Sequence, residues 1–191
     1  DETCLCPHAL EGCGRLERVV LTGEKGTVHL YEYALSGCTA LRSVVYRGRI
    51  WEFHEYKDIC SGTFPEIVRR FFHSAFSCFE VEQEENLCGY RGAGRILKIP
   101  EGIRRIEAEV FRDVLMLEDV EIPKSVVYMG ARAFHGTGGL LRQREKDPLV
   151  TVNHMLLDGS GCAGEVAVPE DVRLVCGWDF AGGLQIRKLR F

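Results

Sequence analysis

An internal repeat limits the folds open to this chain more than any other feature of its sequence. The tripeptide Ile99-Pro100-Glu101 returns 23 residues later as Ile122-Pro123-Lys124, and the same step carries Phe111 to Phe134. At three times this step, Phe111 corresponds to Phe180. A fixed period of this size is the sequence signature of an array of stacked structural units.

The N-terminal part repeats with a slightly longer step. Ala9-Leu10-Glu11-Gly12-Cys13 returns 25 residues later as Ala34-Leu35-Ser36-Gly37-Cys38. One frame fits every copy, because an apolar anchor residue is followed by apolar residues six, nine and eleven positions later. The matched Cys13 and Cys38 are interpreted as small buried hydrophobic side chains, as free cysteine often is. The anchors are Leu10, Leu35, Phe111, Phe134 and Phe180.

The end of each unit predicts a β-strand. Around Leu117, Val120 and Ile122 the apolar residues come to alternate, and Pro123 then ends the strand because proline cannot donate to a ladder. A turn leads from there to the next anchor. One strand per 23–25 residues is the geometry of leucine-rich repeats. We therefore expect a leucine-rich-repeat solenoid, β-rich and α/β horseshoe-like, with parallel strands, one per repeat.

Residues 47–85 contain no clean copy of the repeat. Thr63 as N-cap, with Pro65 and Glu66 in the first turn, predicts a helix across the apolar run that follows. This helix would replace or decorate one coil. The acidic residues 80–85 are expected to form a solvated connection.

A second charged interruption lies at residues 141–154. The segments 86–99 and 153–168 are both expected to be hairpin-like lead-ins to a strand. The length of the chain fits a single repeat domain over residues 1–191. We divide it into N-terminal repeats, an irregular helical insertion and C-terminal repeats, at residues 1–46, 47–85 and 86–191.

Four segments resemble the repeats of one known family, the BspA-type leucine-rich repeats. Residues 99–111 (IPEGIRRIEAEVF), 122–134 (IPKSVVYMGARAF) and 168–180 (VPEDVRLVCGWDF) share its pattern, and residues 34–44 (ALSGCTALRSV) resemble its turn into the strand. In bacteria such repeats typically occur in proteins of unknown role or in surface proteins that bind host or partner proteins. The resemblance therefore implies a bacterial protein with a non-enzymatic recognition role, and it carries no catalytic residue onto this chain.

Composition excludes some classes of partner and leaves the compartment open. With 24 basic and 28 acidic residues, the net charge of −4 argues against nucleic acid. No apolar run is long enough to span a bilayer. Nine scattered cysteines favour reduced thiols and, slightly, a cytoplasmic location. Because the sequence begins at Asp1, a removed leader and a cell-surface location stay possible.

Two groups of residues could form a metal site or a catalytic pair, but neither pattern is specific. Cys4-Leu5-Cys6-Pro7-His8 with Cys13 carries zinc-type ligands, yet the spacing is atypical and the segment is accounted for by the repeat. Cys60 with His54 or His73 could form a nucleophile–base pair, but no orienting third group is evident. We predict no enzyme activity, no metal and no cofactor.

A binding surface is predicted on the strand residues that point away from the core. Positions eight and ten after an anchor lie between the buried positions of each strand, so their side chains face outwards. Such a face is either an ordinary solvated surface or a partner-binding surface of mixed charge. Trp51, Phe53 and Tyr56 are either exposed binding anchors or core residues of a degenerate coil. The predicted surface residues are Arg18, Val20, Ser43, Val45, Asp119, Glu121, Lys188 and Arg190.

The function we expect is recognition of a protein or glycan without catalysis. The alternative is a cytoplasmic structural or regulatory module of unknown role with redox-responsive cysteines. A third hypothesis is an enzyme that uses Cys60 or an N-terminal metal. Neither Asp1 nor Phe191 is covered by a polar capping unit. We therefore also expect either a longer protein or self-association through these ends.

Overall fold

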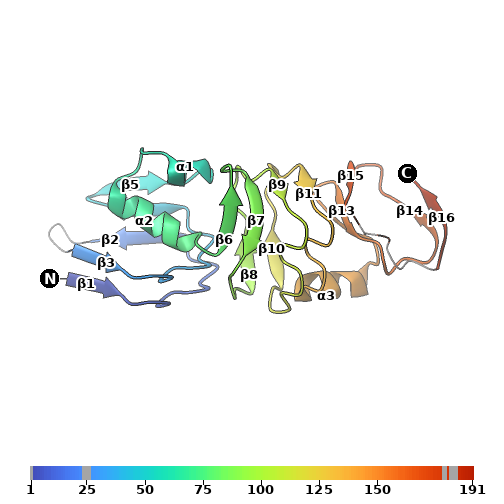
Figure 1. Ribbon diagram of the computed structural model, residues 1–191, viewed down its shortest axis with the longest axis horizontal. Helices are drawn as coiled ribbons and strands as arrows, with labels where there is room; N and C mark the ends of the chain where they lie inside the picture. Colours follow the sequence, from blue (N-terminus) through green and yellow to red (C-terminus); the bar gives the residue numbers. More distant parts are fainter. Residues whose placement is uncertain (1, 23–26, 178–179, 181–184) are drawn as a thin grey trace.

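The computed structural model describes residues 2–22, 27–177, 180 and 185–191. The molecule is elongated, with β1, β2, β3 and β5 near one end and β14 and β16 at the other (Figure 1). The described helices are α1 (Lys57–Cys60), α2 (Glu66–Ala75) and α3 (Gly138–Lys146). The described strands are β1 (Glu2–Leu5), β2 (Arg18–Leu21), β3 (Thr27–Leu30), β4 (Ser43–Tyr46), β5 (Arg49–Glu52), β6 (Phe79–Glu82), β7 (Asn86–Tyr90), β8 (Ile96–Lys98), β9 (Arg105–Ile106), β10 (Asp119–Glu121), β11 (Tyr128–Met129), β12 (Val150–Val152), β13 (Met155–Asp158), β14 (Gly164–Ala167), β15 (Leu174–Val175) and β16 (Ile186–Arg190).

Neighbouring repeats pair with each other as parallel strands. β1 pairs with β3 so that Leu5 lies opposite Leu30, and β2 pairs with β4, again between residues 25 apart. In the C-terminal half, β8 pairs with β10 so that Leu97 lies opposite Val120, and β9 pairs with β11 at the same step of 23. These registers match both steps of the sequence repeat.

The expectation of one strand per repeat is wrong. β10 forms where a strand was predicted, but Arg105–Ile106, assigned to a turn, also form a strand, β9. These second strands are too short to show an alternating pattern in the sequence. The two strands of a repeat pair with strands of neighbouring repeats in two different sheets. The described residues therefore form a β-rich repeat fold of small, separate sheets of two to four strands. They do not form one continuous horseshoe sheet.

Residues in the left-handed backbone conformation flank four of the anchors and turn the chain at the same two places in each of these four coils. The residue two before the anchor and the residue two after it both have positive φ, which few residues other than glycine adopt readily. The repeat is thus visible in the backbone as well as in the sequence. Before the anchors stand His8, Tyr33, Glu109 and Arg132, and after them Gly12, Gly37, Asp113 and Gly136.

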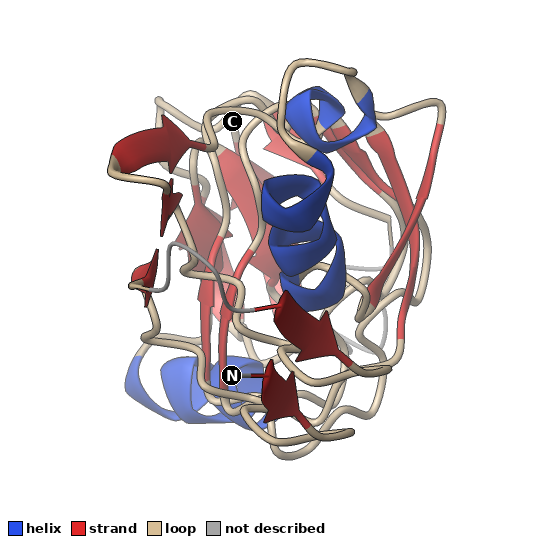
Figure 2. Cartoon of the chain, turned by 90° about the vertical axis from the view of Figure 1, so that its left-hand side faces the viewer, coloured by secondary structure: helices blue, strands red, loops and turns tan. Residues whose placement is uncertain are grey.

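Helix α2 takes the place of a coil. Backbone hydrogen bonds join the first coil to the second: Leu10 N–H donates to Ala34 O, and Gly12 N–H donates to Ser36 O. The second coil continues this pattern onto the end of α2, because Leu35 N–H donates to the Ser74 hydroxyl and Gly37 N–H to the Ala75 carbonyl. Figure 2 shows this helix lying across the end of the molecule beside the N-terminal strands.

The N-terminus of α2 differs from the sequence prediction. The helix begins at Glu66 with Pro65 as N-cap and has no side-chain cap. Thr63 is not the cap, because its hydroxyl instead lies 2.8 Å from that of Ser61. The proline fixes a backbone conformation that starts a helix without a capping hydroxyl.

Three β-hairpins interrupt the array, and each has two consecutive turn residues with positive φ, as in type I′ turns. They join β4 to β5, β6 to β7, and β12 to β13. The predicted hairpin-like lead-ins at 86–99 and 153–168 are wrong, because among the described strands β7 does not pair with β8 and β13 does not pair with β14; β8 and β14 pair instead with strands one repeat later. The second and third hairpins use the strand that precedes each segment, and β6 takes in Glu80 and Glu82, so the acidic run is not only a connection. The first hairpin was not predicted. The turn pairs are Arg47-Gly48, Gln83-Glu84 and Asn153-His154.

Helix α3 occupies the first part of the segment predicted to be a charged excursion, residues 141–146, and the third hairpin follows it. It begins after Thr137, whose hydroxyl accepts a hydrogen bond from Leu140 N–H, and none of its described residues is fully buried. The three-unit step that relates Leu87 to Leu156 also relates α2 to the region of α3. Both helices precede a hairpin, so the larger unit consists of a helix, a hairpin and the coils that follow.

A chain of aromatic rings runs through the core from the N-terminal sheet to the C-terminal repeats. Successive ring centroids lie 4.7–6.5 Å apart, within the range of favourable aromatic pairs. Phe53 is a buried core residue, and Trp51 and Tyr56 are partly buried against the core, so none of the three is a fully exposed anchor. The rings in order are Trp51, Phe64, Phe72, Phe53, Phe76, Phe79, Tyr90, Phe111 and Phe134.

Candidate functional site

The predicted surface residues lie in three separate places along the molecule. The first four are in the sheet β2–β4–β5, Asp119 and Glu121 are in β10, and Lys188 and Arg190 are in β16 (Figure 1). They therefore do not form one continuous face. The structure brings together only Arg18, Val20, Ser43 and Val45.

The sheet β2–β4–β5 carries two cross-strand rows on the face opposite the buried Val44. In the apolar row, Val20 lies opposite Val45, and Val45 lies opposite Ile50. The outer two members are unusually open for aliphatic residues, since Val20 is 53% and Ile50 is 50% exposed. Aligned apolar side chains in solvent mark a surface suited to a partner.

A polar row lies beside the apolar one. Arg18, Ser43 and Glu52 are in register across the three strands. The Arg18 guanidinium donates a hydrogen bond of 2.9 Å from Nε to the Ser43 hydroxyl. The prediction that Ser43 is exposed is wrong: it is 4% exposed, because it lies between its neighbours on both sides.

An open groove of about 540 Å³ adjoins the polar row. Its walls come from the ends of β2, β4 and β5 and from the chain that leaves β5. The groove offers both donors and acceptors, and Phe53 contributes an apolar side chain. It is lined by Glu17, Arg18, Arg42, Ser43, Glu52, Phe53 and His54.

Several charged residues around this sheet have no ionic partner among the described residues. In the part of the chain that the structure describes, no ion pair involves Arg18, Arg42, Arg47 or Arg49, nor Glu52. Arg47 and Arg49 instead lie over the rings of Tyr46 and Trp51. In a protein of net charge −4, this sheet is an arginine-rich region.

The other predicted surface residues are mostly paired across their own strands. Glu121 on β10 forms an ion pair with Lys98 on β8. On the last ladder, Lys188 and Arg190 both bind Glu165, at 3.7 and 2.8 Å. These side chains satisfy one another, so their charges are less available to a partner than those of the β2–β4–β5 sheet.

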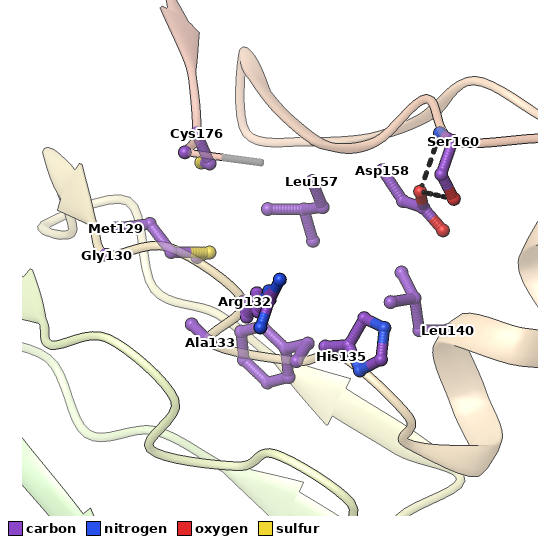
Figure 3. Close-up of a pocket in the computed structure, with 12 residues that line it drawn as sticks. Met129, Gly130, Arg132, Ala133, His135, Leu140, Leu157, Asp158, Ser160 and Cys176 are labelled. Atoms are coloured by element: carbon purple, nitrogen blue, oxygen red, sulfur yellow. Dashed lines mark hydrogen bonds between the residues drawn. The ribbon is translucent and has the colours of Figure 1, made fainter. Parts of the chain in front are cut away.

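A smaller cavity of about 120 Å³ lies beyond the last ring of the aromatic chain (Figure 3). Phe134, Leu157 and Cys176 are among its apolar lining residues. Leu157 stands 23 residues after Phe134, so the cavity occupies the level at which another aromatic anchor would lie. The carboxylate of Asp158 at its edge accepts bonds from the Ser160 backbone N–H and hydroxyl, as the dashed lines show.

The structure adds no support for Cys60 as a nucleophile or for a metal site at the N-terminus. Desolvation, the larger cause, and the nearby Glu84 raise the pKa of the exposed Cys60 thiol, which disfavours the nucleophilic thiolate. At the N-terminus, His8 Nδ1 lies 2.7 Å from Glu11, and its ring stacks on Tyr33. Among the described residues, no three of the types His, Cys, Asp or Glu are grouped to hold a metal ion.

The cysteines of the two N-terminal coils differ in their environment. Cys38 is fully buried, as predicted, but Cys13 is exposed, so its assignment as a buried hydrophobe is wrong. The first coil has no neighbour on its outer side among the described residues, and its Cys13 therefore lacks the cover that Cys38 receives.

Sequence reasoning missed Ile50 and Glu52, which extend the two rows onto β5. The hairpin that places them turns at Arg47-Gly48, whereas the strong hairpin signals are Asn-Gly and Asp-Gly. A weaker signal was present, because two short β-prone segments flank a glycine two residues after the strand end.

Comparison with known families supports the repeat assignment. The family model for the BspA type leucine rich repeat region matches residues 93–190 in six copies. No curated protein and no solved structure matches the chain. In the described residues, no helix is long and apolar enough to cross a membrane. Since the match spans half of the sequence and the strand registers repeat at the same step, the chain belongs to the BspA-type leucine-rich repeat family.

Proposed function

We propose that this protein is a non-enzymatic recognition scaffold that binds a protein partner through the outer face of β2–β4–β5. Leucine-rich repeats generally mediate protein binding, and stacked repeats offer extended surfaces for it. The observation that carries the proposal is the exposed row Val20–Val45–Ile50 beside an open polar groove.

The charges around this face favour a particular kind of partner. Arg18 and Arg42, which line the groove, have no ionic partner among the described residues, so an acidic segment would gain ion pairs with them without breaking existing ones. The apolar row would cover one or more aliphatic or aromatic side chains of the same segment. The proposed partner is therefore a protein segment in which apolar residues are flanked by Asp or Glu.

Selection from a displayed library of short random peptides tests this proposal. The native chain is compared with the double variant Val20→Ser/Ile50→Ser, which keeps the strands but removes the apolar row. The matched control is Leu115→Ser/Met116→Ser, since those side chains are also exposed and lie outside the sheet. We expect acidic–apolar peptides to bind the native chain and the control, and to lose roughly tenfold or more in affinity on the first variant.

Two further observations complete the test. Raising the salt concentration should weaken binding, because the arginines are exposed and screened by ions. A glycan array probed in parallel addresses the other ligand class. Binding of glycans that is lost with Val20→Ser/Ile50→Ser, with no peptide selected, would overturn the assignment of a protein partner.

A further inference from the structure

The thiol of Cys38 and the backbone of Cys13 meet at one carbonyl oxygen. Leu10 O accepts a hydrogen bond of 3.2 Å from Cys13 N–H and another of 3.1 Å from Cys38 Sγ. The two cysteines hold the same position in neighbouring coils, three residues after their anchors. The turn of the first coil thus lies directly against the thiol of the second.

The backbones of these coils are close enough for a disulfide. Leu10 N–H bonds to Ala34 O, and Gly12 N–H bonds to Ser36 O, both at 2.7 Å. Hydrogen-bonded neighbouring chains lie about 4.8 Å apart. The Cα atoms of bridged cysteines are typically about 4.4–6.8 Å apart, so matched residues in such coils fall inside this range.

We propose that Cys13 and Cys38 are a redox-active pair that forms a disulfide and staples the first coil to the second. The oxidant is a small disulfide such as glutathione disulfide. The Cys13 thiolate attacks one sulfur of glutathione disulfide, which forms a mixed disulfide and releases one glutathione thiolate. Cys38 then attacks Cys13 Sγ and releases the second glutathione, so that two protein thiols become one disulfide and two molecules of glutathione are produced.

The two cysteines have different roles because their exposure differs. Cys13 is exposed, so its thiolate can attack glutathione disulfide in solution. Cys38 is fully buried, so it reacts only with the mixed disulfide formed on Cys13. Burial, and to a lesser degree the adjacent Cys13, raises the pKa of the Cys38 thiol to about 11. Cys38 is therefore a poor first nucleophile and acts as the resolving thiol at short range.

The Cys13–Cys38 disulfide would restrain the first coil of the repeat array, which is poorly buried. No described side chain between residues 3 and 22 is fully buried, so the first coil has little core of its own. Opening of this coil would carry Arg18 and Val20 on β2 away from Ser43 and Val45 on β4. A disulfide would hold the two strands together, independently of what binds to them.

The test incubates the native chain in glutathione redox buffers, blocks free thiols with an alkylating reagent and maps the cross-linked peptides by mass spectrometry. We expect one bridge, between Cys13 and Cys38, that dithiothreitol reverses. Cys13→Ser and Cys38→Ser should each abolish it. Cys4→Ser/Cys6→Ser is the matched control, because it removes two other exposed thiols of the first coil and should leave the bridge intact.

Hydrogen exchange of the β2 amides provides a second readout. Oxidation should slow exchange roughly tenfold or more, because opening of the first coil is then restricted by the cross-link. A bridge between Cys38 and the buried Cys78, a bridge through Cys4 or Cys6, or an unchanged exchange rate in the oxidised chain would overturn the proposal. These outcomes do not depend on the partner proposed above.

Discussion

The ring of Phe111 stacks on the ring of Phe134, with 4.7 Å between the centroids and 13° between the planes. The two residues are one repeat apart, and backbone bonds join their coils on both sides of the rings, such as Phe111 N–H to Ala133 O at 2.8 Å. The anchors of these two coils thus pack on each other. This contact shows how a repeat in sequence becomes a continuous core, since no single unit could bury its own aromatic residue.

Removal of this anchor should destabilise the whole array. Phe111→Ala is expected to cost about 3–5 kcal/mol, because the fully buried ring touches neighbours on both sides and leaves a cavity. Urea unfolding measures the change. Met116→Ala, at an exposed position in the same repeat, should change stability by less than about 0.5 kcal/mol. Equal effects of the two substitutions would contradict the proposed stacking.

The left-handed turns of the coils can be tested at glycine. Gly37 has φ of +79°, and a Cβ there would lie 3.4 Å from Gly12 of the neighbouring coil. Gly37→Ala should therefore destabilise the protein by about 1–2 kcal/mol. Gly62→Ala is the control, because that glycine has no positive φ and no atom within 4 Å of an added Cβ. If thermal unfolding shows the same midpoint for both variants, the turn geometry is wrong.

The ion pair between Arg95 and Glu118 predicts a pH dependence. A hydrogen bond from Arg95 lowers the pKa of the Glu118 carboxyl, and the charges of Arg95 and Arg142 act in the same direction. A lowered pKa in the folded state means that the pair stabilises the fold above the ordinary pKa of glutamate. The contribution is lost as the pH falls through the lowered value.

Arg95→Gln should shift the carboxyl titration of Glu118, followed by NMR, back towards the ordinary pKa of glutamate. The shift should shrink at high salt because the pair is exposed. Lys124→Gln, which removes a charge with no described ion pair, serves as the control. An unchanged Glu118 titration in Arg95→Gln would show that this pair does not set the pKa.

The cysteines should react with iodoacetamide in an order set by burial. Burial raises the pKa of Cys38 to about 11 and that of Cys78 to about 12, so neither thiol should react in the folded protein. The exposed Cys4, Cys6 and Cys13 should be alkylated first. Mass spectrometry at successive times measures the order, and early modification of Cys78 would contradict the described core.

The sequence predicted the period, the anchors and the strand at Val120 because each depends on apolar residues repeated at fixed spacing. It missed the two-residue strand β9, which is too short to show a pattern. It also missed α3, although the relation of Leu87 to Leu156, extended to the preceding helix, would have predicted it.

The candidate site was predictable only in part. The strand frame placed Arg18, Val20 and Val45 on one side of the sheet, and the structure agrees on their alignment. The frame could not show that Glu121 is paired with Lys98, since ion pairs between strands depend on the register and on long flexible side chains. Nor could it show that β5 completes the face with Ile50.

Photo-crosslinking from single positions tests the proposed binding face most directly. A photoreactive amino acid is placed at Val20 or Ile50, and in separate chains at Asp119 or Lys188, and each chain is irradiated in an extract of the cells that produce the protein. We expect one and the same protein to be cross-linked from Val20 and Ile50, with no such product from Asp119 or Lys188. Products that form only from Asp119 or Lys188 would contradict the assignment of the binding face to β2–β4–β5.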